Sequence, residues 1–136
     1  MSNHGGRQID GAIPAIWALE RICQSPKVKA AQLSGAFTVL ADSGLRTGTD
    51  IFRSIAMGAQ GVLCKQFFIT LRSFSSRSLP TVGRSYMYGL AVGGQDGVET
   101  VVKSILAEFD ITLGLCGHKC IADIWGKAGE VMVKID

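Results

Sequence analysis

The stretch Ala36-Phe37-Thr38-Val39-Leu40-Ala41-Asp42-Ser43-Gly44-Leu45-Arg46-Thr47-Gly48-Thr49-Asp50 carries the signals that decide the fold. Its apolar run, Ala36 to Ala41, is typical of a strand buried on both faces. The run ends at the charged Asp42. A second short apolar segment, Gly61-Val62-Leu63, predicts another strand of the same kind. We expect the two strands to be parallel neighbours in an α/β fold.

A helix is predicted between these two strands. Gly44 and Gly48 frame a tight turn after the first strand, and either Thr47 or Thr49 can cap the helix that follows. The apolar residues of this helix are Ile51, Ile55 and Ala56.

The segment before the first strand predicts a loop, a helix and a connection. Residues 1–13 are a Gly-rich loop, and Pro14 suits the first turn of a helix that runs to about Cys23. One face of that helix carries Ile16, Leu19, Ile22 and Cys23. Residues 24–35 are predicted to form a polar connection.

Two further helices are predicted after the second strand. They cover residues 86–92 and 97–115, with a loop between them, and the second has a continuous apolar face. That face comprises Val98, Val101, Val102, Ile105, Leu106 and Phe109. The tail, residues 125–136, is expected to be peripheral.

Composition limits the function classes. Hydrophobic residues make up 47% of the 136 residues, and the formal net charge is only +3. Scattered basic residues do not favour nucleic-acid binding. No apolar run reaches the roughly 20 residues of a membrane span, and no signal peptide is recognisable, so we expect a cytoplasmic protein.

The cysteines predict neither disulfides nor a metal site. Without a signal peptide, reduced thiols are the expectation for the four cysteines at positions 23, 64, 116 and 120. Cys116-Gly-His118-Lys-Cys120 offers three ligands but has no second Cys/His pair at zinc spacing.

Five blocks of sequence carry a family resemblance. They begin with Ser2-Asn3-His4-Gly5-Gly6-Arg7-Gln8-Ile9-Asp10-Gly11-Ala12 and continue with residues 39–50, 58–63, 82–91 and 110–124. In this order the blocks resemble the flavin-dependent 2-hydroxy acid oxidase and dehydrogenase family. The Asp42-Ser43-Gly44 variant is most similar to the lactate 2-monooxygenase branch.

The resemblance implies an incomplete barrel. Members of the family fold as a TIM (β/α)8 barrel, which needs roughly 250 residues. We therefore expect residues 1–136 to form a partial barrel domain, from about the end of strand six to strand eight with the associated helices.

The resemblance also implies catalytic roles for the first block. His4 matches the base of the family, and an imidazole has a pKa near working pH. Arg7 matches the residue that binds the substrate carboxylate, for which a planar guanidinium is well suited. Whether the substrate loses a hydride or first becomes a carbanion stays open. The alternative is that residues 1–10 are a frayed terminus.

FMN is the cofactor that the resemblance implies. Barrels commonly bind phosphate at the loops after strands seven and eight. The matching positions are Ser2 near the flavin ring, Asp42, Ser43, Gly44, Leu45 and Arg46 in the first loop, and Gly83 and Arg84 in the second. Without the resemblance, these two loops would be interpreted only as turns.

Residues 64–81 interrupt the family pattern. Removing them would join Leu63 to Val82 and restore it, and the segment lacks acidic residues but is rich in Ser, Arg and Phe. The leading explanation is a translated intron or gene-model artefact, and the second is a surface loop.

Two functions from different classes follow. The first is FMN-dependent oxidation of a small, lactate-like 2-hydroxy acid to the 2-oxo acid or its oxidative product. The second is an inactive fragment that binds at most FMN phosphate, a complementary barrel half or another copy of itself. The earlier strands of the family supply a Lys beside the flavin and a Tyr and second Arg at the substrate. We therefore expect these 136 residues alone to be inactive and prone to association. The particular acid and the electron acceptor are not specified by the sequence.

Overall fold

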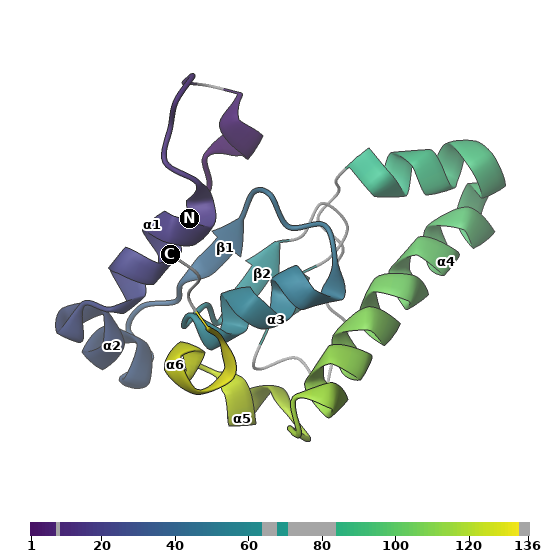
Figure 1. Cartoon of the computed structure of the whole chain (residues 1–136). Coiled ribbons are helices and arrows are strands. Elements are labelled where there is room, and N and C mark those ends of the chain that lie inside the picture. The colour runs from purple at the N-terminus through teal and green to yellow at the C-terminus, as the bar shows by residue number, and fades with distance from the viewer. Residues whose placement is uncertain (8, 64–67, 71–83, 134–136) are drawn as a thin grey trace.

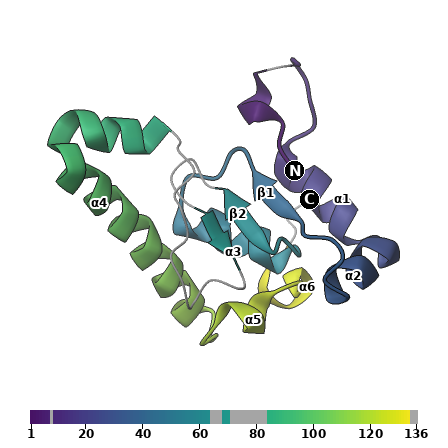
Figure 2. The same ribbon diagram turned by 180° about the vertical axis from the view of Figure 1, so that it is seen from behind.

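The computed structural model describes residues 1–7, 9–63, 68–70 and 84–133 (Figure 1). The helices and strands are η1 His4–Gly6, α1 Ala15–Cys23, α2 Pro26–Leu33, β1 Leu40–Asp42, α3 Gly48–Ala56, β2 Gly61–Leu63, β3 Phe68–Thr70, α4 Arg84–Leu115, α5 Ile121–Ile124 and α6 Ala128–Val131. The strands lie between α1 and α2 on one side and the long α4 on the other, and α3 packs beside them (Figures 1 and 2).

The sheet confirms the parallel pair of strands. β1 and β2 are parallel, with Ala41 opposite Val62, and β3 pairs antiparallel with the other edge of β2. The backbone of Met1 occupies the remaining edge of β1. Its amine donates to Leu40 O at 2.7 Å, and its carbonyl accepts from Asp42 N at 2.9 Å. Both edges of the parallel pair are thus occupied over part of their length, rather than open as we expected.

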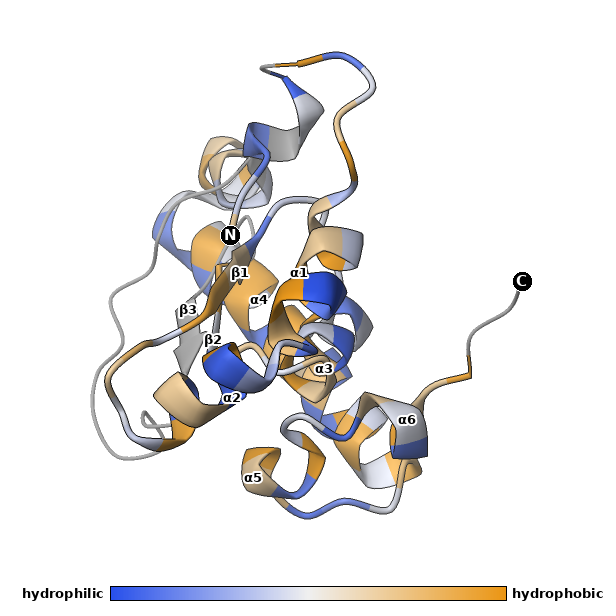
Figure 3. Ribbon diagram, turned by 90° about the vertical axis from the view of Figure 1, so that its left-hand side faces the viewer, coloured by the Kyte–Doolittle hydropathy of each residue, from blue (hydrophilic) through white to orange (hydrophobic). Residues whose placement is uncertain are grey.

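The core lies between the sheet, α1, α3 and α4, where apolar segments gather in Figure 3. Ile51 and Ile55 of α3 and Val62 of β2 are buried. The structure resolves the choice of helix cap: the Thr47 side chain accepts from Asp50 N, and the Asp50 carboxylate accepts from Thr47 N. This capping box fixes where α3 begins, directly after the loop that follows β1.

Two elements differ from the sequence-based prediction. The strand is shorter than residues 36–41, since β1 begins at Leu40 and residues 36–38 are exposed. Within residues 24–35, predicted to be a polar connection, Pro26–Leu33 form the helix α2. Pro26 opens that helix at its first turn. Gln32 is buried and donates to Gly58 O at 2.9 Å, so α2 contributes a polar contact to the core.

The two helices predicted for residues 86–115 are present as two arms of α4. The break falls at Gly93 and Gly94, which have non-helical backbone angles. The arms approach closely at Gly89 and Gly97, because a side-chain carbon on Gly89 would lie 2.8 Å from Gly97 O. Glycine is therefore required where the arms cross.

The tail is better anchored than predicted. The Trp125 indole donates to Gly58 O at 3.2 Å, and Gly126 N donates to Ile55 O at 3.2 Å. These bonds hold the segment from α5 to α6 against α3. Among the described helices, none has the length and hydrophobicity needed to cross a bilayer.

Candidate functional site

The N-terminal motif and the loop after β1 meet through hydrogen bonds. Ser2 Oγ donates to Asp42 Oδ2 at 2.8 Å and lies 3.1 Å from Ser43 Oγ. Asn3 N donates to Ser43 Oγ at 3.2 Å. These bonds bring together residues that are about 40 positions apart in the sequence. The motif is therefore tied to the carboxyl end of β1, and the described bonds argue against a frayed terminus.

The loop after β1 has an unusual backbone. Ser43 has φ +81° and Gly44 has φ +80°, which is the left-handed region that favours glycine. The Asp42 carboxylate accepts from Ser43 N as well as from Ser2. Nothing lies within 4 Å of a side-chain carbon placed on Gly44, so the backbone there is open to a ligand.

His4 and Arg7 lie at the surface around the short helix η1. Both side chains are exposed, and His4 has φ +54°. The backbone of His4 is held by a bond from its N–H to Ser2 Oγ at 3.1 Å. His4 and Arg7 thus lie on one loop next to the Asp42 loop, but the contacts that fix them are made by their neighbours.

Asn3 helps to shape this site, and our sequence reasoning assigned it no role. Its side chain accepts from Gly6 N at 3.1 Å and donates to Ile13 O at 3.3 Å. Asn is among the residues preferred at a helix N-cap, so its position directly before the His4–Gly6 turn was a usable signal. Asn3 closes the loop that carries His4 and Arg7.

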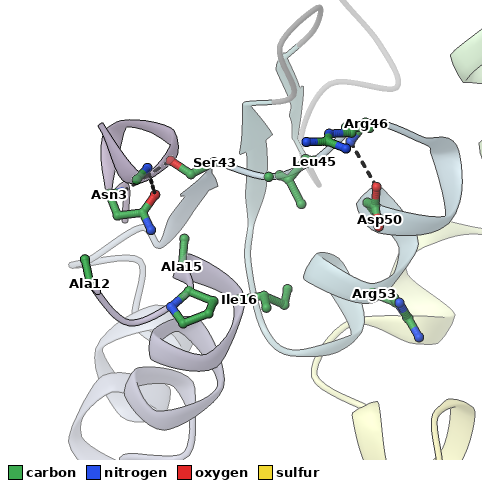
Figure 4. A pocket seen from close by; sticks show the side chains of 12 residues that line it. Asn3, Ala12, Ala15, Ile16, Ser43, Leu45, Arg46, Asp50 and Arg53 are labelled. Carbon is green, nitrogen blue, oxygen red and sulfur yellow. Dashed lines mark hydrogen bonds between the residues drawn. The ribbon is translucent and has the colours of Figure 1, made fainter. Parts of the chain in front are cut away.

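A cavity of about 380 Å³ opens beside this loop (Figure 4). Its lining includes Asn3, Ser43, Gly44 and the two arginines Arg46 and Arg53. A second cavity, of about 410 Å³, is lined by Ser2, Asn3, His4, Ile9 and Ala12. Of the predicted site residues, Ser43, Gly44, Leu45 and Arg46 line the first cavity, and Ser2 and His4 line the second. Arg7 and Asp42 are in neither lining.

The amide groups at the start of α3 are used within the protein. Arg46 N and Thr47 N donate to Asp50 Oδ2, and Gly48 N donates to Glu108 Oε2 at 3.0 Å. A phosphate at this end of the sheet would therefore contact the loop of residues 42–46 and the Arg46 guanidinium rather than those amides. Leu45 is buried and anchors this loop to the hydrophobic core.

The second predicted phosphate loop is described only in part. Gly83 lies outside the described residues, and Arg84 is the first residue of α4. The predicted insertion, 64–81, contains β3, and its remaining residues also lie outside the described part.

The groups whose pKa is shifted lie outside this site. Burial raises the pKa of the Cys23 thiol, partly offset by the charge of Lys29. Hydrogen bonds from the backbone of Lys119 and from Cys120 lower the pKa of Asp123. Cys23, Cys116 and Cys120 are free thiols. Within the described residues, no group of three or more His, Cys, Asp or Glu side chains could hold a metal ion.

Residues 1–71 and 79–130 match the sequence model of the FMN-dependent dehydrogenase family. The unmatched residues are 72–78, which fall inside the predicted insertion, and 131–136. The match thus includes residues 64–71 and 79–81 of that insertion. The FMN-dependent alpha-hydroxy acid dehydrogenase qulF of Penicillium citrinum is 37% identical over 90% of this chain and 24% of its own length. L-lactate oxidase of Nostoc sp. is 40% identical over 91% of this chain and 27% of its own length.

Solved structures of mandelate oxidase resemble the chain in fold. One of them, with benzoyl-formic acid, has a TM-score of 0.66 at 34% identity and covers 93% of this chain and 30% of its own. The peroxisomal (S)-2-hydroxyacid oxidase GLO3 of Arabidopsis thaliana is 39% identical over 91% of this chain and 27% of its own length. The chain thus spans about a quarter of the length of the curated relatives that it matches.

Proposed function

Because the chain belongs to the FMN-dependent dehydrogenase family, we propose that it forms the catalytic-loop portion of an enzyme that oxidises a small, lactate-like 2-hydroxy acid. The product is the 2-oxo acid or a compound derived from it by further oxidation. The chain's share of the barrel contains the two loops to which we assign substrate binding and part of the cofactor site.

One observation carries this proposal: the segment with His4 and Arg7 is hydrogen-bonded to the loop after β1. Ser2 and Asn3 make these bonds, to Asp42 and Ser43. A hydroxy acid must contact a base, a cation and the flavin at once, and two loops meeting at one end of a parallel sheet permit that arrangement.

We assign separate tasks to His4 and Arg7. The His4 imidazole takes the proton of the substrate hydroxyl, and the Arg7 guanidinium binds the carboxylate through paired hydrogen bonds. Both side chains are exposed to solvent, and His4 lines the second cavity, so a substrate can approach them. Bound FMN would supply the acceptor for the two electrons and the hydrogen that leave the substrate carbon.

The residues present fit the phosphate end of FMN. The open backbone at Gly44 and the Arg46 guanidinium border one cavity, and this combination of amide groups and a cation suits a phosphate. We propose that residues 42–46 hold the phosphate and ribityl end together with Gly83 and Arg84, and that Ser2 lies near the flavin ring.

We also propose that the working form needs further polypeptide, either a complementary barrel half or another copy. Large apolar side chains are exposed along α4: Met87, Tyr88, Leu90, Val92, Leu106, Ile111 and Leu115. Exposed apolar surface of this extent favours association. The proposed location is the cytosol, although the Arabidopsis relative is named as peroxisomal.

The test is to co-express residues 1–136 with the N-terminal two-thirds of a lactate oxidase relative. We expect flavin absorbance in the purified complex and oxidation of lactate, whereas residues 1–136 alone stay colourless and inactive with added FMN. His4→Ala should lower kcat by about 10²- to 10⁴-fold, the usual contribution of a general base. Arg7→Lys should mainly raise KM, because a lysine cannot form the paired contact.

Arg21→Lys, an exposed arginine of α1, is the matched control and should leave turnover unchanged. If the complex binds flavin but His4→Ala retains full turnover, the assignment of the base is wrong. If no complex oxidises any 2-hydroxy acid, the inactive fragment is the better description.

A further inference from the structure

We infer that Ser43 is a positioning residue: its hydroxyl holds the His4–Arg7 loop on the end of β1, and the part that Ser43 takes in the proposed phosphate site is that of its backbone. The relevance of Ser43 to catalysis rests on the proposed roles of His4 and Arg7. The hydrogen bonds that Ser43 makes to the N-terminal motif do not depend on those roles.

The hydroxyl of Ser43 contacts two residues of the N-terminal motif. It accepts from Asn3 N at 3.2 Å, and its oxygen lies 3.1 Å from Ser2 Oγ. Ser2 Oγ in turn accepts from His4 N at 3.1 Å. Ser43 thus contacts Asn3 directly and reaches the backbone of His4 through one intermediate atom.

The direction of the hydrogen bond between Ser2 Oγ and Ser43 Oγ follows from the number of protons that each hydroxyl can donate. A serine hydroxyl has one proton to donate, and Ser2 donates its own to Asp42 Oδ2 at 2.8 Å. The proton between Ser2 and Ser43 must therefore come from Ser43. Ser2 Oγ then donates one bond and accepts two, so the oxygen that holds the backbone of His4 is saturated. Replacing Ser43 by a residue without a hydroxyl removes a donor from Ser2 and an acceptor from Asn3.

The backbone at this position argues that the hydroxyl matters. Ser43 has φ +81°, a conformation in which glycine is free of strain and serine is not. Glycine would therefore suit the loop better if only the turn were required. The serine supplies what glycine cannot, which is the hydroxyl bonded to Asn3 and Ser2.

Amide exchange measured by NMR on the whole 136-residue chain separates positioning from stability. We expect Ser43→Gly to accelerate exchange of the Asn3 and His4 amides by about fivefold, the loss of one ordinary hydrogen bond. The Ile51 amide, which donates to Thr47 O within the core, should exchange at the wild-type rate or more slowly. Ser43→Ala should accelerate the same two amides and also weaken the fold, since it keeps the strained backbone.

Two results would overturn the inference. One is wild-type exchange at Asn3 and His4 in Ser43→Gly, and the other is acceleration there that merely parallels Ile51. Because Ser43→Gly relieves strain, it tests the inference even if Ser43→Ala does not fold. Exchange is measured without flavin or substrate, so a co-expressed complex that oxidises no 2-hydroxy acid would refute the proposed function and leave this result unaffected.

Discussion

At the scale of single residues, the candidate site is held together by short polar side chains from the N-terminal motif and from the loop after β1. His4 and Arg7 are the residues whose chemistry is visible in the sequence, yet their positions are set by Asn3 and Ser2. A histidine or an arginine indicates its chemistry by residue type alone. A serine or asparagine does so only through its partners, and those partners are known only from the fold. This difference explains why the sequence pointed to the proposed reacting groups but missed Asn3.

Asp123 provides a residue-scale test by pH. Its carboxylate accepts from Lys119 N and Cys120 N, both at 3.1 Å, and these bonds lower its pKa. A lowered pKa in the folded state means that the stabilisation is complete above the ordinary carboxyl pKa and is lost as the pH falls through the folded value. Asp123→Ala should therefore lower Tm at pH 7 by a constant amount down to about pH 5, and the difference should close below about pH 4. Thermal unfolding followed by circular dichroism measures this. Asp110→Asn, an exposed carboxylate on α4, serves as the control. A difference in Tm that persists unchanged at low pH would contradict the cause given.

At the scale of elements, the pattern of apolar residues predicted the parallel strands, α1, α3 and the two arms of α4. The apolar pattern gave the wrong element where tertiary contacts determine the secondary structure. Ala36, Phe37 and Thr38 have the composition of a strand but are exposed, because β1 pairs with β2 only from Leu40 onward. Residues 26–33 have little apolar periodicity, yet they form α2, which is held to the core where Gln32 donates to the buried Gly58 and the half-buried Gln60. Such polar contacts between distant segments leave no periodic signal.

The packing of α3 on α4 depends on Gly48. A side-chain carbon there would lie 2.7 Å from Glu108 Cβ and would also clash with the backbone N of Phe109. Gly48→Ala should therefore lower the free energy of unfolding by about 2 kcal/mol or more, because backbone on both helices must shift. Gly114→Ala is the matched control: it lies in α4 with no atom within 4 Å of the added carbon. That change should stabilise by up to about 1 kcal/mol. Urea unfolding of both variants gives the comparison, and equal stabilities would mean that the helices adjust freely.

At the scale of the whole molecule, the described residues contain two adjoining parallel strands and the loop that follows β1. Met1 pairs with β1 in the parallel sense, as a preceding barrel strand would. β3 pairs antiparallel with the opposite edge of β2, where a parallel barrel would place its next strand. Residues 68–70, the described part of the segment 64–81, therefore occupy an edge that barrel closure requires. The sequence marked this segment by composition, but only the sheet shows which edge it covers.

Deleting residues 64–81 should restore that edge. In a complex with the N-terminal two-thirds of a lactate oxidase relative, we expect the shortened chain to bind FMN at least tenfold more tightly than the uninterrupted one. The deletion frees β2 to pair with a parallel strand, and it brings Gly83 and Arg84 directly after that strand. Loop-closure entropy alone would not produce such a difference, since it changes by only about 0.6 kcal/mol for each doubling of loop length. Quenching of flavin fluorescence measures both affinities, and Arg84→Ala in the shortened chain should remove most of the gain. Equal affinities would mean that 64–81 is a tolerated surface loop and that β3 can leave the edge of β2 without cost.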